Sequence, residues 1–188
     1  DPVYSPDGKT IAFSSDRSGN YDIWTMDVAT GAMKQISSNP REDRMPTWSP
    51  DGRRVAYAGA EGMMGGALYV TDLATGQESL LKKVEGKADA PSFGPGGALA
   101  YVVQDASGSH LFIDDKQVSG TENVFPFRVS WGTRGGYHYV SDGKVRQGGP
   151  RKSTVDFAAT LEVVRPSYTR AKRDWDSTAP RKALGITH

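Results

Sequence analysis

The sequence predicts an all-β fold, part of a β-propeller with about three clear four-stranded antiparallel blades and a degenerate fourth. Three observations support this: a repeat of about 44 residues, turn residues at fixed places within the repeat, and alternating apolar and polar residues between the turns. Nothing in residues 1–149 has sustained helical periodicity. Four short strands in about 40–45 residues are the unit of a propeller blade.

A turn motif opens each repeat. Residues 4–13 read YSPDGKTIAF, and residues 48–57 read WSPDGRRVAY. Eroded copies follow at 93–101, FGPGGALAY, and from Trp131 onward. In Ser-Pro-Asp-Gly the proline fixes φ at the second position and the glycine takes the last, as in a type I turn. Each copy therefore predicts a hairpin between the first two strands of a blade.

The second half of the repeat predicts two more strands. Residues 22–31, DIWTMDVATG, align with residues 67–76, ALYVTDLATG. The Ala-Thr-Gly element should join a third strand to a fourth, with glycine where positive φ is needed. The expected strands are about 21–28 and 33–37 in the first repeat, and about 66–73 and 77–82 in the second.

The two glycine turns differ in what they should tolerate. Gly52 ends an intact Ser-Pro-Asp-Gly turn, whereas Gly96 is followed by a second glycine that can share the strain. A β-branched residue forced to positive φ costs on the order of 1–3 kcal/mol. We therefore expect Gly52→Val to destabilise the protein more than Gly96→Val does.

The repeat also predicts the domain organisation. Residues 1–149 should hold the blades, and residues 150–188 an outer strand and a connector toward a further blade. The blade boundaries are expected near 1–46, 47–91, 92–127 and 128–149. Trp48, Phe93 and Trp131 occupy equivalent repeat positions, so we expect them to pack between blades.

These motifs resemble a known family. The aromatic-Ser-Pro-Asp-Gly turn, the Ile/Val-Ala-Phe/Tyr run and the segment DRSGNYDIW at 16–24 are similar to the TolB-like β-propeller repeat. The resemblance covers residues 1–127 well and 128–149 loosely. The family includes the periplasmic TolB protein of the Tol–Pal system and the non-catalytic propellers of secreted peptidases and metal-dependent amidohydrolases. Residues 168–180 are similar to a connecting segment in those amidohydrolases.

The resemblance implies a function in one of two classes. In the first, the chain is a non-catalytic scaffold or protein-binding module, a periplasmic or secreted fragment of a larger protein. In the second, it is the propeller portion of a secreted hydrolase, an amidohydrolase or a peptidase, and shapes access to a catalytic domain absent here. Under either hypothesis this chain is not itself an enzyme.

Composition excludes several classes of partner. The chain has 23 Lys and Arg against 22 Asp and Glu, a formal charge of +1, so no nucleic-acid partner is expected. No apolar run approaches the 18 or so residues that a membrane span needs. Cysteine is absent, which removes thiol nucleophiles and cysteine zinc sites but leaves the compartment open.

No catalytic residue, cofactor or metal ion is predicted. The three histidines, His110, His138 and His188, have no ligand spacing, and the first two are expected to be strand residues within blades. No Gly-x-Ser-x-Gly motif exists to support a hydrolase serine. The glycines within 62–66 have no Lys-Ser/Thr after them, so a hairpin tip is expected rather than a phosphate loop.

Asp16, Asn20 and Asp22 have the oxygen ligands of a calcium loop. The bidentate glutamate that such a loop carries at its twelfth position is missing, because residue 27 is aspartate in a strand. We therefore expect these side chains to stabilise a turn instead.

One set of charged residues remains as a candidate site. Segments 39–44 and 84–89 are expected to be loops that enter the first strands of the second and third blades and gather on one face of the propeller. Solubility alone also explains their charge, so both interpretations stay open. The candidate residues for a protein or peptide partner are Arg41, Asp43, Arg44, Lys87 and Asp89.

An open arc of blades would expose its first and last blades, and exposed edges associate. The sequence therefore also predicts a homodimer through these edges.

Overall fold

The computed structural model describes residues 1–61, 65–132, 135–149, 152–158 and 160. Its contacts divide the chain into two compact units, Asp1–Asp156 and Phe157–His188, and the fold below is that of the first. Within the described residues it is all-β apart from one short 3-10 helix, η1 (Pro95–Gly97). None of these residues forms a helix long and apolar enough to cross a membrane.

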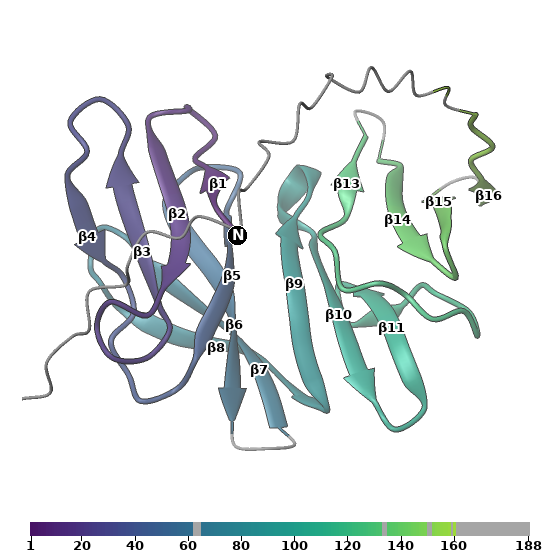
Figure 1. Cartoon of the computed structure of the whole chain (residues 1–188), viewed down its shortest axis with the longest axis horizontal. Coiled ribbons are helices and arrows are strands. Elements are labelled where there is room, and N and C mark those ends of the chain that lie inside the picture. Colours follow the sequence, from purple (N-terminus) through teal and green to yellow (C-terminus); the bar gives the residue numbers. More distant parts are fainter. Residues whose placement is uncertain (62–64, 133–134, 150–151, 159, 161–188) are drawn as a thin grey trace, which may run out of the picture. The chain divides into compact units, whose positions relative to one another are not determined.

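The strands form four antiparallel four-stranded sheets, each built from four strands in chain order (Figure 1). The first sheet contains β1 (Val3–Tyr4), β2 (Thr10–Ser15), β3 (Asp22–Asp27) and β4 (Met33–Gln35). The second contains β5 (Asp43–Trp48), β6 (Arg54–Glu61), β7 (Gly65–Asp72) and β8 (Glu78–Glu85). The third contains β9 (Lys87–Phe93), β10 (Leu99–Asp105), β11 (Gly108–Ile113) and β12 (Lys116–Gln117). The fourth contains β13 (Ser130–Trp131), β14 (Tyr137–Ser141), β15 (Lys144–Gly148) and β16 (Ser153–Thr154).

This architecture confirms the all-β propeller prediction. The expected third and fourth strands of the first two repeats are β3, β4, β7 and β8, within a few residues at each end. In the segment from residue 150 onward, β16 pairs with β15 as the outer strand of the fourth sheet. Residues 157, 158 and 160 lie outside any strand, and the rest of the expected connector lies outside the described residues.

The Ser-Pro-Asp-Gly turns close the hairpins as predicted. The backbone N–H of Gly8 donates to the Ser5 carbonyl at 2.9 Å, and that of Gly52 donates to the Ser49 carbonyl at 2.9 Å. Each serine hydroxyl donates to the aspartate of its own turn, at 2.6 Å to Asp7 and 2.5 Å in the second repeat. The turn is therefore held by its own side chains, which explains why the motif recurs intact.

The third turn also requires a left-handed backbone conformation at its glycines. Gly96 has a φ of +73°, close to the +68° of Gly52, and Gly97 has a φ of +88°. The second glycine adds a further left-handed residue and leaves the strain at position 96 unchanged. The expectation that valine is better tolerated at 96 than at 52 therefore has no support in the backbone geometry.

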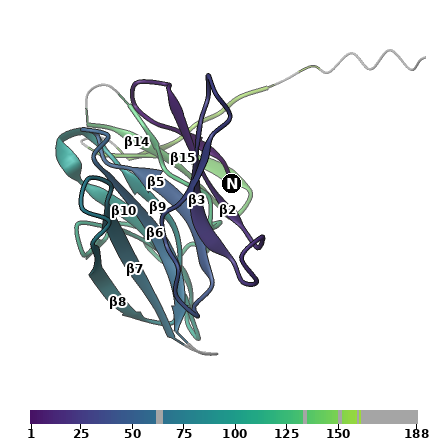
Figure 2. The ribbon, with the colours of Figure 1, turned by 90° about the vertical axis from the view of Figure 1, so that its left-hand side faces the viewer.

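The hydrophobic cores lie between sheets. One core joins Ala12 and Ile23 of the first sheet to Trp48, Val55 and Tyr57 of the second in a single buried cluster. Figure 2 shows β2 and β3 alongside β5 and β6, the strands that supply these side chains. The seams between sheets therefore carry much of the apolar burial that stabilises the fold.

Two of the three aromatic residues act as predicted in these seams. The indole N–H of Trp48 donates to the Val3 carbonyl of the first sheet at 3.1 Å. The indole N–H of Trp131 donates to the Ser92 hydroxyl of the third sheet at 3.0 Å. Each tryptophan thus connects its own sheet to the preceding one, and the prediction of packing between blades is confirmed for both.

A repeated bulge interrupts the first strands of the second and third sheets. Met45 and Ala90 have φ values of +56° and +51°, and each precedes a fully buried proline, Pro46 or Pro91. The pairing register shifts at these points, between Arg44 and Thr47 in β5 and opposite the Ala100–Val102 step of β10. The bulge places the charged residues that precede it inside a strand.

Candidate functional site

Two of the predicted partner-binding residues are engaged within the chain. Asp43 begins β5 with 0% exposure, and its carboxylate accepts hydrogen bonds from Asn39 at 2.8 Å and Arg41 at 3.4 Å. The Arg41 guanidinium also donates to Glu78 of β8 at 2.9 Å and lies 3.6 Å from the centre of the Tyr69 ring. Asp43 is therefore a buried strand residue, not the loop residue that the sequence suggested.

This cluster, which we call the clamp (Asn39, Arg41, Asp43, Tyr57, Tyr69 and Glu78), holds the segment before β5 against β7 and β8. Burial raises the pKa of Asp43, against hydrogen bonds from Ser37, Asn39 and Arg41 that lower it. The Tyr57 hydroxyl donates to Glu78 at 2.6 Å. Burial raises the pKa of Tyr57 most, and this hydrogen bond raises it further. A buried charge needs such partners, so the clamp has a structural role.

The other three predicted residues come together around one cavity. Arg44 lies in β5, and Lys87 and Asp89 lie in β9, so these three also belong to strands and not to loops. The cavity, which we call the rim pocket, has a volume of about 350 Å³. It is lined by Glu42, Arg44, Met45, Ala58, Gly59, Ala60, Gly65, Gly66, Lys87, Ala88 and Asp89.

The charges of the rim pocket are paired with one another. Arg44 donates to Glu42 at 3.0 Å, and its guanidinium lies 3.4 Å from the centre of the Tyr21 ring. Lys87 pairs with Asp89 at 2.8 Å, while 67% of the lysine side chain is exposed. The charged side chains at the rim of the pocket are thus paired, and the charges of the two pairs sum to zero.

A second cavity lies among the first strands of the sheets. β1, β5 and β9 are neighbours in Figure 1, and this central pocket, of about 380 Å³, forms between them and the segment leading into β13. It is lined by Val3, Tyr4, Pro6, Thr47, Trp48, Pro50, Ser92, Phe93, Gly94, Pro95, Arg128 and Val129. Most of these side chains are apolar or aromatic.

Arg128 is the one charged side chain among these lining residues. Its Nη2 donates to the Pro46 carbonyl at 2.8 Å, and its Nε is buried with no hydrogen-bond partner. No carboxylate among the described residues forms a salt bridge with it, and burial lowers the pKa of Arg128. A partly desolvated guanidinium without a counter-charge is costly, and an anion placed in the pocket would relieve that cost.

The sequence interpretation missed Arg128, although a signal for it exists. Arg128 stands three residues before Trp131, as Met45 stands before Trp48 and Ala90 before Phe93. Across the four copies this position holds Asp1, Met45, Ala90 and Arg128. Arg128 is the one basic residue among them, and this difference between copies is the signal that could have identified it.

The segment from Asp105 to His110 contains the three residue types of a catalytic triad in another arrangement. The Ser107 hydroxyl donates to Asp105 at 2.6 Å and lies 2.9 Å from His110 Nε2. In a triad the imidazole stands between serine and carboxylate, whereas here the serine stands between them, and His110 Nδ1 faces Gln117 at 3.5 Å. This arrangement is a side-chain-stabilised turn.

The remaining expectations concern histidines and metal ligands. His110 and His138 lie in β11 and β14 as predicted, and His188 lies outside the described residues. Asp22 accepts a hydrogen bond from Ser18 in its own turn at 2.5 Å, as expected. Asn20 instead donates to the Asn39 carbonyl at 2.9 Å, in the segment before β5, and the Asp16 carboxylate makes no described hydrogen bond. Across the described ranges, no three acidic or histidine side chains gather as metal ligands would.

A protein-family model matches the first third of the chain. The family model described as the TolB beta propeller domain matches residues 1–62, which contain the first sheet and the first two strands of the second. The chain carries the TolB-like propeller repeat. The TolB-like motif seen in the sequence is thereby confirmed.

Two curated relatives match parts of this chain. The uncharacterized peptidase YuxL of Bacillus subtilis (strain 168) is 26% identical over 150 residues, which are 77% of this chain and 22% of that protein. The Tol-Pal system protein TolB of Francisella tularensis subsp. holarctica (strain OSU18) is 33% identical over 75 residues, 39% of this chain and 17% of that protein. The chain thus spans about a fifth of the length of these relatives.

Solved structures share the TolB-like fold. A structure assigned as TolB from Agrobacterium tumefaciens has a TM-score of 0.70 at 20% identity, covering 82% of this chain and 63% of that one. A puromycin-hydrolyzing peptidase of Mycobacterium tuberculosis has a TM-score of 0.68 at 14% identity, covering 83% of this chain and 29% of that one. At these identities the likeness is one of fold alone.

Proposed function

We propose that this chain is a non-catalytic binding module whose central pocket receives a carboxylate-bearing segment of a partner protein. The observation that carries the proposal is Arg128, a partly buried guanidinium that no described carboxylate pairs with, at the wall of an open cavity. A carboxylate accepts charge-assisted hydrogen bonds from a guanidinium, and the Arg128 guanidinium has no carboxylate partner among the described residues.

The surroundings of Arg128 suit a protein segment. The cavity volume of about 380 Å³ lies in the range of ligand pockets, and aromatic side chains such as Tyr4 and Phe93 line it around a single cation. Apolar walls with one fixed polar group are typical of sites that bind an amphipathic side chain or chain end. Arg44, Lys87 and Asp89 at the rim pocket remain a second proposed contact area for the same partner.

The comparisons support the class of this function and the compartment. One relative is a component of the Tol-Pal system by its name, and residues 1–62 of this chain match the TolB beta propeller family model. We therefore infer a periplasmic or secreted location. The homodimer expected from the sequence stays a prediction.

Titration with a peptide pair tests the role of Arg128. We expect acetyl-Gly-Gly-Glu-Gly-Gly-amide to shift the NMR signals of the Arg128 Nε–H and the Phe93 amide, and the glutamine analogue to leave them unchanged. Arg128→Met, which installs the residue found at the equivalent position 45, should abolish the response; Arg53→Met, at an exposed turn arginine, should keep it. Equal responses to both peptides, or a response retained by Arg128→Met, would refute the assignment.

A second candidate function is the propeller portion of a secreted hydrolase. It is favoured by the match to the Bacillus subtilis peptidase, which covers 77% of this chain, more than the TolB match does. Because the described residues hold no triad geometry, we expect purified 1–188 to hydrolyse no peptide, ester or cyclic amide substrate under either hypothesis. Turnover that disappears in His110→Ala would contradict both.

A further inference from the structure

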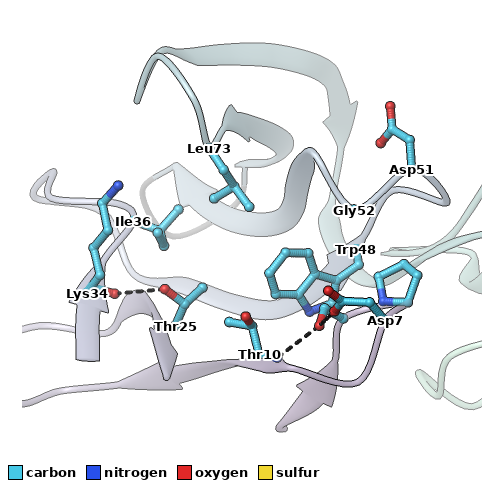
Figure 3. Close-up of a pocket in the computed structure, with 11 residues that line it drawn as sticks. Asp7, Thr10, Thr25, Lys34, Ile36, Trp48, Asp51, Gly52 and Leu73 are labelled. Carbon is cyan, nitrogen blue, oxygen red and sulfur yellow. Dashed lines mark hydrogen bonds between the residues drawn. The ribbon is translucent and has the colours of Figure 1, made fainter. Parts of the chain in front are cut away.

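A third cavity lies in the seam between the first and second sheets, at the end where their Ser-Pro-Asp-Gly turns lie. This seam pocket has a volume of about 370 Å³, within the range of small-molecule sites. In Figure 3 the Trp48 ring, Ile36 and Leu73 form an apolar middle. Lys34 stands at one side of it, and Asp7 and Asp51 stand at the other.

The charges at the two sides are fixed differently. Asp7 Oδ1 accepts hydrogen bonds from the Ser5 hydroxyl at 2.6 Å and the Lys9 N–H at 3.1 Å, and Asp51 Oδ1 is held in the same way by Ser49 and Arg53. The second oxygen of each carboxylate has no hydrogen bond among the described contacts. These hydrogen bonds lower the pKa of both aspartates, and the bond from the serine hydroxyl contributes most. Both carboxylates are therefore ionised at neutral pH.

The opposite side carries an unpaired cation and a buried hydroxyl. Lys34 forms no salt bridge with any described residue. Thr25, which is 8% exposed, makes one described hydroxyl bond, a long one of 3.4 Å to the Lys34 carbonyl. From one side of the seam pocket to the other, its lining thus carries a cation, a hydroxyl group, an apolar surface and two carboxylates.

The second repeat shows that the fold does not require threonine and lysine at these two positions. Thr25 pairs with Ala12 and Lys34 in the first sheet, and the same register in the second sheet puts Val70 and Ser79 at the equivalent positions. Asp7 and Asp51, in contrast, each also hold their own turn through Oδ1. Threonine and lysine are thus replaced by valine and serine where the strand pairing is alike.

We propose that the seam pocket binds a dipeptide with apolar side chains and free termini, a ligand site distinct from the central pocket. The dipeptide carboxylate would pair with Lys34, its ammonium group with Asp7, and its side chains would lie on Trp48. The Thr25 hydroxyl would bond to the peptide group between the termini. Such a zwitterion matches both the order of charges and the apolar middle of the pocket.

Calorimetric or NMR titration with leucyl-leucine tests this site, with N-acetyl-leucyl-leucine and leucyl-leucine amide as matched ligands. We expect each blocked form to bind at least about tenfold more weakly, because each loses one charge pair. Lys34→Ser, the residue found at position 79, should weaken leucyl-leucine to the level of the amide and leave the amide unchanged. Lys144→Ser, at an exposed lysine of β15, should change nothing.

Three outcomes would overturn the proposal. The first is the absence of any response to leucyl-leucine up to its solubility limit. The second is equal binding of the doubly blocked N-acetyl-leucyl-leucine amide, which would indicate that the pocket takes the interior of a protein segment. The third is unchanged binding in a folded Lys34→Ser variant. None of these outcomes bears on Arg128, so this proposal and the proposed function can fail separately.

Discussion

Arg41 and Arg44 are three residues apart, and the structure gives them opposite environments. Arg41 is mostly buried between the Asp43 carboxylate, Glu78 and the Tyr69 ring. Arg44 pairs with Glu42 on the surface, with both side chains about half exposed. Ion pairs in these two settings contribute very differently to stability, because removing one partner of a buried pair leaves an uncompensated charge.

We therefore expect Arg41→Ala to lower the free energy of unfolding by about 1–3 kcal/mol, since it leaves the buried Asp43 without its cation. Arg44→Ala should lower it by less than about 1 kcal/mol, the contribution of a surface pair and a cation–ring contact. Urea unfolding of the two variants measures both changes. Equal losses would mean that the clamp does not hold the segment before β5.

Sequence reasoning grouped these two arginines because their neighbours in the chain are alike. The partners that separate them come from β7 and β8, more than 25 residues further on, and no local pattern reports such contacts. Arg128 was missed for the opposite reason. Its signal lies in a comparison between repeats, and the repeat around it has lost the proline turn that would have fixed the alignment.

At the scale of elements, the third-to-fourth-strand turns depend on aspartates. Asp27 accepts hydrogen bonds from the Thr30 hydroxyl at 2.7 Å and its backbone N–H at 2.8 Å, and Asp72 makes the same bonds with Thr75. These hydrogen bonds lower the pKa of both carboxyl groups below the usual 3.8. The largest contribution comes from the Thr30 hydroxyl for Asp27 and from the Thr75 backbone N–H for Asp72.

This gives a pH prediction with a definite sign. A carboxyl whose folded pKa is lowered contributes stability that is present above the unfolded pKa and is lost as the pH falls through the folded pKa. We expect the doubly substituted Asp27→Asn, Asp72→Asn protein to be less stable than the wild type at pH 7 and equally stable near pH 2. Asp16→Asn, at a carboxylate with no described hydrogen bond, is the matched control and should lower the stability at pH 7 by less than the double substitution does. Urea midpoints across this pH range measure the difference.

The glycine turns provide the second prediction at this scale. Gly52 and Gly96 have φ values of +68° and +73°, and a Cβ at either position meets nothing closer than 3.7 Å. The cost of valine is therefore backbone strain alone, on the order of 1–3 kcal/mol at each site. Denaturant midpoints of Gly52→Val and Gly96→Val should agree. A markedly milder effect at 96 would restore the expectation drawn from the sequence.

The hairpins could be predicted from the sequence, whereas the bulges could not. Ser-Pro-Asp-Gly specifies its turn through its own side chains, so four residues contain the information. Met45 and Ala90 adopt left-handed φ directly before a proline, although neither residue type nor a position before proline favours it. Both prolines are fully buried, and the bulges lie in the same strands as Asp43, Arg44, Lys87 and Asp89.

At the scale of the first unit, binding and stability use the same seams. The buried clusters join neighbouring sheets, and the rim, central and seam pockets all lie where sheets meet. The repeat predicts each sheet and the tryptophans that pack between sheets, but not the pockets in a seam, because a pocket depends on side chains from both sheets. This is why the fold class followed from the sequence while the central pocket did not.

The central claim, that the chain binds a partner protein at its central pocket, is tested most directly by site-specific photo-crosslinking in an extract of the source cells. A photoreactive phenylalanine replaces Tyr4, which lines the central pocket and is 62% exposed. The control replaces Leu80, which is 56% exposed on β8 and outside this pocket. We expect one discrete protein adduct from position 4, none from position 80, and loss of the adduct when Arg128→Met is added. No adduct at position 4, or the same adduct from both positions and with Arg128→Met, would contradict the account.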